Sequence, residues 1–225
     1  MARVNLKRRA EIASAKRART RAEILKAARL CYTAPAAAPM TVEAVMQKAG
    51  LAKGTFYVHF DDLLGLEAEL GDTLIQELDE RLQPARLAAH HPLTRLATAL
   101  TILLRHLAGA PAQARLVVRA AAALPEVRDA MRTHLREDLA DLRAAGLLAL
   151  PSVELAAGVV TALCVQALRE IGDGQIDDTA VPDFVRAVLR ALGCAPNTAA
   201  VHAQKAGRNA EVFLQQTAAS GRPCA

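Results

Sequence analysis

The sequence has little of what several protein classes require. Aromatic residues make up only 3% of its 225 residues, and tryptophan is absent. The four cysteines are widely spaced and form no CxxC pair, which argues against a zinc site or a disulfide framework. The longest apolar stretch, Leu155 to Val165, is shorter than the roughly 18 residues that a membrane span needs. Because the first residues also lack a signal-peptide apolar segment, we expect a cytoplasmic protein without a membrane span.

The sequence also lacks the recurring motifs of enzymes. It has no nucleophile motif, paired carboxylates, metal-ligand spacing or Gly-rich phosphate loop. The dipeptide His90-His91 is a weak metal candidate, because adjacent residues do not face one site on a helix. We therefore expect no enzymatic activity, no cofactor and no metal ion.

What the sequence does contain favours helices. Hydrophobic residues make up 52% of the chain, and most are alanine and leucine, which lose little on entering a helix. No strand-like alternation and no internal repeat interrupts the helical periodicity. We predict an all-α fold of about nine helices.

Charge is distributed unevenly along the chain. Residues 1–60 contain 12 basic and 3 acidic residues, whereas residues 61–225 contain 16 and 20. A basic head on a mildly acidic body is typical of a protein that docks one end onto a polyanion. For residues 1–15 alone, a solvated and partly disordered basic tail explains the composition equally well.

Three helices are predicted in the first 60 residues. The first runs from about Arg21 to Tyr32, with Thr20 as its cap and Glu23 completing a capping box. The second begins after Thr41 and ends at Gly50, a residue that tolerates a left-handed conformation. The third covers residues 53–60, with Phe56 and Phe60 on one face. Two short helices joined by a glycine turn are typical of a helix-turn-helix.

The remaining chain predicts a helical bundle. A long helix starts after Asp61 or Asp62 and carries a leucine at nearly every fourth position, up to Pro84. Prolines and glycines separate the further predicted helices, which are Pro92–Ala108, Ala112–Leu124, Pro125–Ala145, Ser152–Ile171 and Pro182–Leu192. One more helix is possible between Thr198 and Ala219. The predicted organisation is a basic arm (1–19), a helix-turn-helix domain (20–62), a ligand-binding and dimerisation domain (63–195) and a tail (196–225).

Three segments of the head resemble the TetR family of bacterial regulators. They are TRAEILKAA from Thr20, TVEAVMQKAG from Thr41 and LAKGTFYVHF from Leu51, and the spacing between them is also that of the family. The rest of the chain resembles the family only in the number and length of its helices. The resemblance implies a DNA-binding transcriptional regulator, most often a repressor that a small molecule releases from its operator.

The resemblance also implies which residues meet DNA. In the family the third helix enters the major groove, where Thr55 would meet a phosphate or a thymine methyl and Lys53 a phosphate or a guanine edge. Gly54 would allow close approach, Tyr57 and His59 would clamp the backbone, and Val58 would make an apolar contact. The full set of expected DNA-binding residues is Lys53, Gly54, Thr55, Tyr57, Val58, His59, Thr41, Glu43, Arg17 and Arg19.

The chain departs from the family pattern at three positions. Leu63 replaces a lysine that often touches a phosphate, and the basic arm could compensate by reaching along a groove. Ala36 replaces the usual glycine after the first helix. Glu43 could accept a hydrogen bond from a cytosine amine, but we favour a role at the positive end of its own helix.

The body is expected to form a homodimer through the helices at about 152–171 and 182–192. The first of these is apolar almost all round and so should be buried on every side, partly against a second subunit together with Phe184, Val185, Val188, Leu189 and Leu192 of the next helix. Two heads would then address half-sites about 34–36 Å apart.

The resemblance also implies a pocket for a small molecule in the body. Phe184 and Phe213 are the only aromatic residues beyond residue 60, so we expect a small apolar or aliphatic ligand. Five polar residues on apolar helices could orient it, although each is more often a surface or core residue: Arg105, His106, Arg119, His134 and Gln166. The alternative function is an architectural or protein-interaction DNA-binding module without a ligand.

Overall fold

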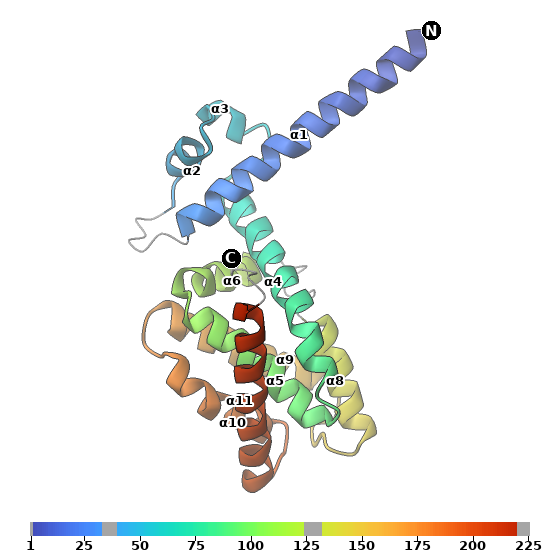
Figure 1. Cartoon of the computed structure of the whole chain (residues 1–225), viewed down its shortest axis with the longest axis vertical. Coiled ribbons are helices and arrows are strands. Elements are labelled where there is room, and N and C mark those ends of the chain that lie inside the picture. Colours follow the sequence, from blue (N-terminus) through green and yellow to red (C-terminus); the bar gives the residue numbers. More distant parts are fainter. Residues whose placement is uncertain (1, 33–39, 124–131, 220–225) are drawn as a thin grey trace.

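The computed structural model describes residues 2–32, 40–123 and 132–219, and every regular element within these ranges is helical (Figure 1). Within these ranges, ten α-helices and one 3-10 helix follow one another. In chain order they are α1 (Ala2–Tyr32), α2 (Val42–Ala49), α3 (Lys53–Phe56), α4 (Leu63–Leu87), α5 (Pro92–Ala108), α6 (Pro111–Ala123), α8 (Thr133–Ala144), α9 (Val153–Gly172), the 3-10 helix η1 (Asp178–Ala180), α10 (Val181–Ala191) and α11 (Pro196–Ala219). The predicted all-α fold is confirmed.

The head consists of α2, α3 and the C-terminal half of α1 (Figure 1). Its small core contains Ile24, Val45 and Phe56, which are fully buried, and Phe60, which is nearly so. This confirms that the two phenylalanines face inward. Their buried side chains fix the orientation of α3. Because successive residues of a helix point in different directions, the residues next to the two phenylalanines face outward.

The predicted ends of α2 are confirmed. The Thr41 side chain accepts a hydrogen bond from the Ala44 N–H at 3.1 Å, as an N-cap does. Gly50 has φ 68°, the left-handed conformation that ends a helix and favours glycine. These local signals define the turn between α2 and α3.

The predicted start of the first helix is wrong. We expected it at Thr20, but α1 begins at Ala2, so the basic arm is helical. Residues 2–32 contain no glycine or proline and are rich in alanine, arginine and lysine, which all favour helix. The chain therefore never leaves the helix, and Thr20 caps nothing. The first half of α1 projects beyond the rest of the molecule (Figure 1).

Helix α4 connects the head to the body (Figure 1). The Asp62 side chain caps it by accepting from the Gly65 N–H at 2.8 Å, as predicted. Leucines at every fourth position line its buried side, namely Leu66, Leu70, Leu74, Leu78 and Leu82. A single core cluster includes most of these leucines and extends from the head into the body.

The predicted end of α4 at Pro84 is wrong, because the helix continues to Leu87. Proline removes one backbone hydrogen bond, but Arg86 holds the last turn in place. Its buried side chain pairs with Asp138 of α8 at 2.9 Å. A tertiary interaction thus overrides the local helix-breaking signal.

The body surrounds α5, which packs against α4, α6, α8, α9, α10 and α11. The predictions for the helices at 92–108 and 182–192 and for the C-terminal helix agree with α5, α10 and α11 within two residues. The predicted helix Pro125–Ala145 is represented by α8, and its first residues lie outside the described ranges, as do Ala36, Leu124 and Ser220–Ala225.

Helix α9 is the one helix in the described ranges that is long and apolar enough to cross a membrane by length and composition. Half of its most apolar window is buried inside the bundle, however, and α9 packs against α5, α6, α8 and α10. A helix buried in a protein core can have the same length and composition as a membrane span.

The interface residues predicted on α10 need correction. Val185, Val188, Leu189 and Leu192 are fully buried within their own chain. They are unavailable to a second subunit because α5, α9 and α11 pack against α10. Phe184, in contrast, is half-buried.

The contact between α4 and α6 leads to a first prediction. A Cβ added at Gly71 would lie 2.3 Å from the Cβ of Ala120, so Gly71→Ala must push the two helices apart. We expect a loss of about 1–3 kcal/mol in the free energy of unfolding, measured by urea denaturation followed by circular dichroism.

The matched control for this substitution is Gly207→Ala in α11, where an added Cβ meets no atom within 4 Å. This control should leave stability unchanged or raise it by up to about 1 kcal/mol, because alanine favours helix over glycine. Equal effects of the two substitutions would contradict the close approach of α4 and α6.

Candidate nucleic-acid interface and internal cavity

The head exposes a row of side chains beside its buried phenylalanines. Tyr57 is 56% exposed and Val58 is 61% exposed, whereas Phe56, the last residue of α3, is fully buried in the core. Lys53 and Gly54 are also exposed, and Thr55 and His59 are half-buried. All six residues expected to meet DNA from this segment therefore reach the surface at least in part.

The third helix is shorter than predicted. Instead of extending to residue 60, α3 ends at Phe56, and residues 57–59 form turns. The chain still coils in the same sense, because His59 N–H and Phe60 N–H both donate to the Phe56 carbonyl at 2.9 Å. The side chains of Tyr57 and Val58 thus follow α3 on one continuous surface.

Two residues expected to meet DNA pair with each other. The Lys53 ammonium contacts the Glu43 carboxylate across the turn between α2 and α3. The hydrogen bond from Lys53 lowers the pKa of Glu43, and the same bond raises the pKa of Lys53. Glu43 therefore forms an ion pair with Lys53. The roles expected from the sequence were only a contact with a cytosine amine and a role at the N-terminus of its own helix. Thr41, in turn, uses its hydroxyl as a helix cap.

The projecting half of α1 carries basic side chains in solvent. Arg8, Arg9, Lys16 and Arg17 are exposed, and Arg19 pairs with Glu23 one turn along at 3.2 Å. The chain thus presents positive charge on a rigid helix where we expected an arm that reaches along a groove.

Arg21 connects the head to α4, a role that the sequence analysis missed. Its Nε donates to Glu69 Oε1 at 3.0 Å, and a second nitrogen donates to the carbonyl of His59. The guanidinium also lies 4.1 Å from the centre of the Phe60 ring. Two turns further along α1, Arg29 pairs with Glu77 at 2.9 Å. The equal spacing of eight residues on both helices is the signal that could have revealed these pairs.

A second junction lies near the end of α1. The Tyr32 hydroxyl donates to Glu67, a nearly fully buried carboxylate of α4, and Arg119 of α6 approaches the same carboxylate at 3.0 Å. Burial, and then the hydrogen bond to Glu67, raise the pKa of Tyr32. Arg119 therefore joins three helices at this junction, away from the cavity described next.

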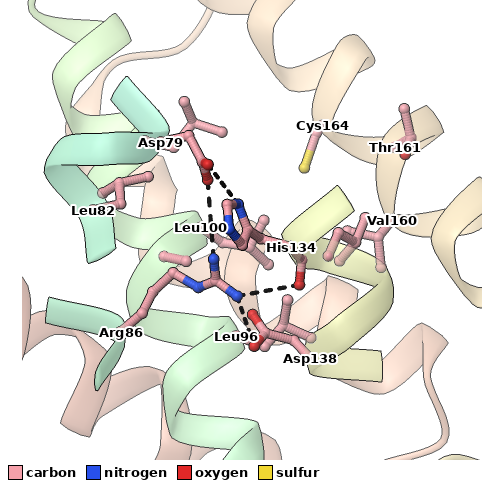
Figure 2. A pocket seen from close by; sticks show the side chains of 13 residues that line it. Asp79, Leu82, Arg86, Leu96, Leu100, His134, Asp138, Val160, Thr161 and Cys164 are labelled. Carbon is pink, nitrogen blue, oxygen red and sulfur yellow. Dashed lines mark hydrogen bonds and ion pairs between the residues drawn. The ribbon is translucent and has the colours of Figure 1, made fainter. Parts of the chain in front are cut away.

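The body contains a cavity of about 100 Å³ between α4, α5, α8 and α9 (Figure 2). Most of its wall is aliphatic. Among the five polar residues proposed to orient a ligand, His134 lines it. The wall consists of Asp79, Leu82, Arg86, Leu96, Ala99, Leu100, Leu103, His134, Leu135, Asp138, Val160, Thr161 and Cys164.

One end of the cavity is polar. Arg86 donates to Asp138 at 2.9 Å and to the carbonyl of His134 at 3.1 Å, while Arg95 donates to Asp138 at 2.7 Å. Asp79 approaches Nδ1 of His134 at 2.5 Å. Figure 2 shows Asp79, Arg86, His134 and Asp138 turned toward one another, with Val160, Thr161 and Cys164 on the facing helix α9. Sequence reasoning missed Asp79, Arg86 and Asp138.

The other proposed ligand residues lie elsewhere. Arg105 pairs with Glu211 of α11 at 3.8 Å, and Gln166 is exposed and donates to Glu170 at 2.8 Å. His106 is half-buried on α5 and does not line this cavity. These residues look alike in the sequence because each is a polar residue on a largely apolar helix.

Solved structures share this architecture. A search against protein-family models found no match, and no curated protein matched either. The structure of RolR in complex with resorcinol has a TM-score of 0.74 and 22% identity, over 84% of this chain and 95% of that one. The transcriptional regulator FadR from Bacillus subtilis, in complex with stearoyl-CoA, has a TM-score of 0.60 and 18% identity, over 76% and 96%.

A third similar structure is NalD, the secondary repressor of the MexAB-OprM multidrug efflux pump in Pseudomonas aeruginosa. Its TM-score is 0.55 at 18% identity, over 79% of this chain and 97% of that one. At these identities the comparisons establish the fold. The chain has the all-helical fold of the TetR-family regulators, as the resemblance of its head implied.

The cavity wall yields a prediction for Cys164. Burial raises the pKa of this thiol to about 12, so at pH 8 almost none of it is the reactive thiolate. We expect alkylation by iodoacetamide to be at least about a thousandfold slower in the folded chain than in urea. Peptide mass spectrometry reports each cysteine separately, and the half-buried Cys31 serves as the internal control. Equal rates for both cysteines would contradict the burial of Cys164.

Proposed function

We propose that this chain is a cytoplasmic, TetR-family transcriptional regulator. As a homodimer it binds a near-palindromic DNA operator, and a small molecule that enters the body releases it, so that it acts as a repressor. The observation that carries the proposal is the exposed row of side chains on and after α3, held in place by the buried Phe56 and Phe60.

The chemistry of this row suits a DNA groove. Thr55 and Tyr57 offer hydroxyl groups to phosphates or base edges, and Val58 offers an apolar surface to a thymine methyl. Lys53 is exposed, and its ion pair with Glu43 is therefore weak. A phosphate can replace Glu43 as its partner. Gly54 has open space beside it, so the backbone there can approach a duplex closely.

The charge distribution supports the same docking direction. The basic head would meet the phosphates while the mildly acidic body faces away. Arg17 and its neighbours on the projecting half of α1 add positive charge to this end of the molecule.

The homodimer would form through α9. Its side away from the core carries Leu155, which is 48% exposed, and the exposed Ala162 and Gln166. Gly158 and Val159 lie between them and are half-buried. Spacings of three and four residues place this set on one stripe, and its small residues allow a second helix to approach closely. Among the five residues predicted for the interface from the helix at 182–192, the half-buried Phe184 is the one that this proposal retains.

Helix α4 would couple ligand binding to DNA release. It carries Glu69 and Glu77, which pair with α1 of the head, and also Asp79 and Arg86 of the cavity wall. A ligand that shifts the C-terminal half of α4 would therefore change the position of the head. In a dimer it would also change the distance between the two heads. The ligand complexes of RolR and FadR support a sensing role for this fold.

The proposed groove-facing row can be tested by substitution. Tyr57→Ala should weaken binding to an operator and to random DNA alike, by about tenfold, because it removes a phosphate contact. Thr55→Ala should change the preference between base sequences by about 1–3 kcal/mol. Both effects can be measured by fluorescence anisotropy with a duplex selected from a random pool and with an unselected duplex.

The control for the DNA-binding experiment is Val212→Ala, an exposed position on α11, which is not part of the head. Repeating the titrations at several salt concentrations separates the two candidate functions. A sequence-specific regulator keeps a large affinity ratio between the two duplexes, whereas an architectural DNA-binding module gives a ratio near one.

The proposed dimer interface yields a further prediction. Leu155→Arg places a charge in the α9 stripe and should shift the protein from dimer to monomer, because the charge would be desolvated in the interface. Val201→Arg on α11 is the matched control, since both native side chains are 48% exposed. Sedimentation velocity measures the result, and dimers that persist in Leu155→Arg would rule out this interface.

A further inference from the structure

The buried guanidinium of Arg86 has unused hydrogen-bonding capacity. The residue is 5% exposed, and one nitrogen, Nη2, binds Asp138 and the His134 carbonyl. Its Nε and Nη1 have no hydrogen-bond partner among the described residues. Because a buried donor without a partner costs about 1–3 kcal/mol, these atoms indicate a site that another molecule fills.

The spacing of Arg86 and Asp79 suits a single bridging oxygen atom. Nη1 of Arg86 lies 3.9 Å from Oδ1 of Asp79, too far for a direct hydrogen bond. One oxygen can lie about 2.8 Å from both atoms. It would accept a hydrogen bond from the guanidinium and donate one to the carboxylate. A hydroxyl group does both, whereas an ether or a ketone cannot donate and a carboxylate would repel Asp79.

The charges around the cavity also disfavour an anion. Three carboxylates, those of Asp79, Asp138 and Asp141, face the guanidinium groups of Arg86 and Arg95. Arg132 on the opposite side, which donates to Thr161 at 3.1 Å, brings the count to three of each sign. Among these described pairs the two signs balance, so they offer an anionic ligand no surplus positive charge, and burying a net charge in this aliphatic wall would be costly.

The size and lining of the cavity limit the rest of the ligand. A second hollow of about 80 Å³ adjoins the first and shares Asp79, Leu82 and Leu103 with it. Its other lining residues are Ile75, Leu78, Val117 and Leu168, all aliphatic. An apolar cavity of about 150 Å³ is large enough for benzene. The two hollows together therefore suit one ring or a short branched chain.

We propose that the body binds a small neutral hydroxy compound, a phenol or alcohol of one-ring size, with its hydroxyl between Arg86 and Asp79. This inference rests on the proposed ligand-sensing function and names the ligand class and the two residues that select it. Leu82, Leu96 and Leu100 contact the apolar remainder of the ligand. The small apolar or aliphatic ligand expected from the sequence is thereby narrowed to a compound of one-ring size with a single polar anchor.

Calorimetric titration of the DNA-free, full-length protein tests the proposal. The probes are 4-methylphenol, toluene, which lacks the hydroxyl, and 4-methylbenzoate, which is an anion. We expect 4-methylphenol to bind at least about tenfold more tightly than either of the other two, because one buried charge-assisted hydrogen bond is worth a factor of this size. Cyclohexanol in place of the phenol shows whether the site prefers aromatic or aliphatic hydroxy compounds.

Variants connect the binding to the named residues. Asp79→Ala should remove the preference for 4-methylphenol over toluene, while Asp72→Ala, a carboxylate on the same helix outside the cavity, should keep it. Arg86→Met should act like Asp79→Ala. If that variant does not fold, Ala99→Phe provides a second test, because its ring fills the hollow and should abolish binding of every probe.

The outcomes separate this inference from the proposed function. Toluene or 4-methylbenzoate binding as tightly as 4-methylphenol, or no binding of any probe, would overturn the hydroxy-compound site and leave DNA binding unaffected. Binding of 4-methylphenol through Asp79 without any change in DNA affinity would support the site and contradict only ligand-driven release.

Discussion

The structure depends on the burial of one side of α4. Leucines at every fourth position, from Leu66 to Leu82, place this helix in the core of the head at one end and of the bundle at the other. Hydrophobic burial is non-directional, so it holds α4 in the core without fixing its register along the neighbouring helices. Polar contacts fix that register. Arg21 and Arg29 define its register against α1, and Arg86 defines it against α8. These contacts connect α4 to the head at one end and to the bundle at the other.

Local sequence signals predicted much of the fold. The cap at Thr41, the left-handed Gly50, the cap at Asp62 and the leucine repeat of α4 each depend on residues within a few positions of one another, and the structure contains all of them. The errors have the opposite origin. The capping box at Thr20 was a correct local pattern inside a segment that never stops being helical, and Pro84 was a local stop signal overruled by a partner 52 residues beyond Arg86.

The two candidate sites differ in how far the sequence predicted them. The row from Lys53 to His59 is contiguous in the chain, so the alternation of buried and exposed positions follows from two phenylalanines four residues apart. Their proposed contacts with DNA remain a prediction. The cavity combines residues from α4, α5, α8 and α9. Of the polar residues chosen from the sequence, only His134 belongs to it. No local pattern distinguishes a buried arginine with a paired charge, such as Arg86, from a more exposed one, such as Arg105, which pairs with Glu211.

In the proposed DNA complex, the projecting half of α1 affects the length of DNA that the protein would cover. Eighteen helical residues, from position 2 to 19, form a rod about 27 Å long at 1.5 Å per residue. Laid beside a duplex, such a rod spans about eight base pairs at 3.4 Å each. In a symmetric dimer the two rods would lengthen the region shielded from nuclease cleavage without reading any further bases. On the proposed operator, the protected region would then be wider than the two half-sites that the heads would contact.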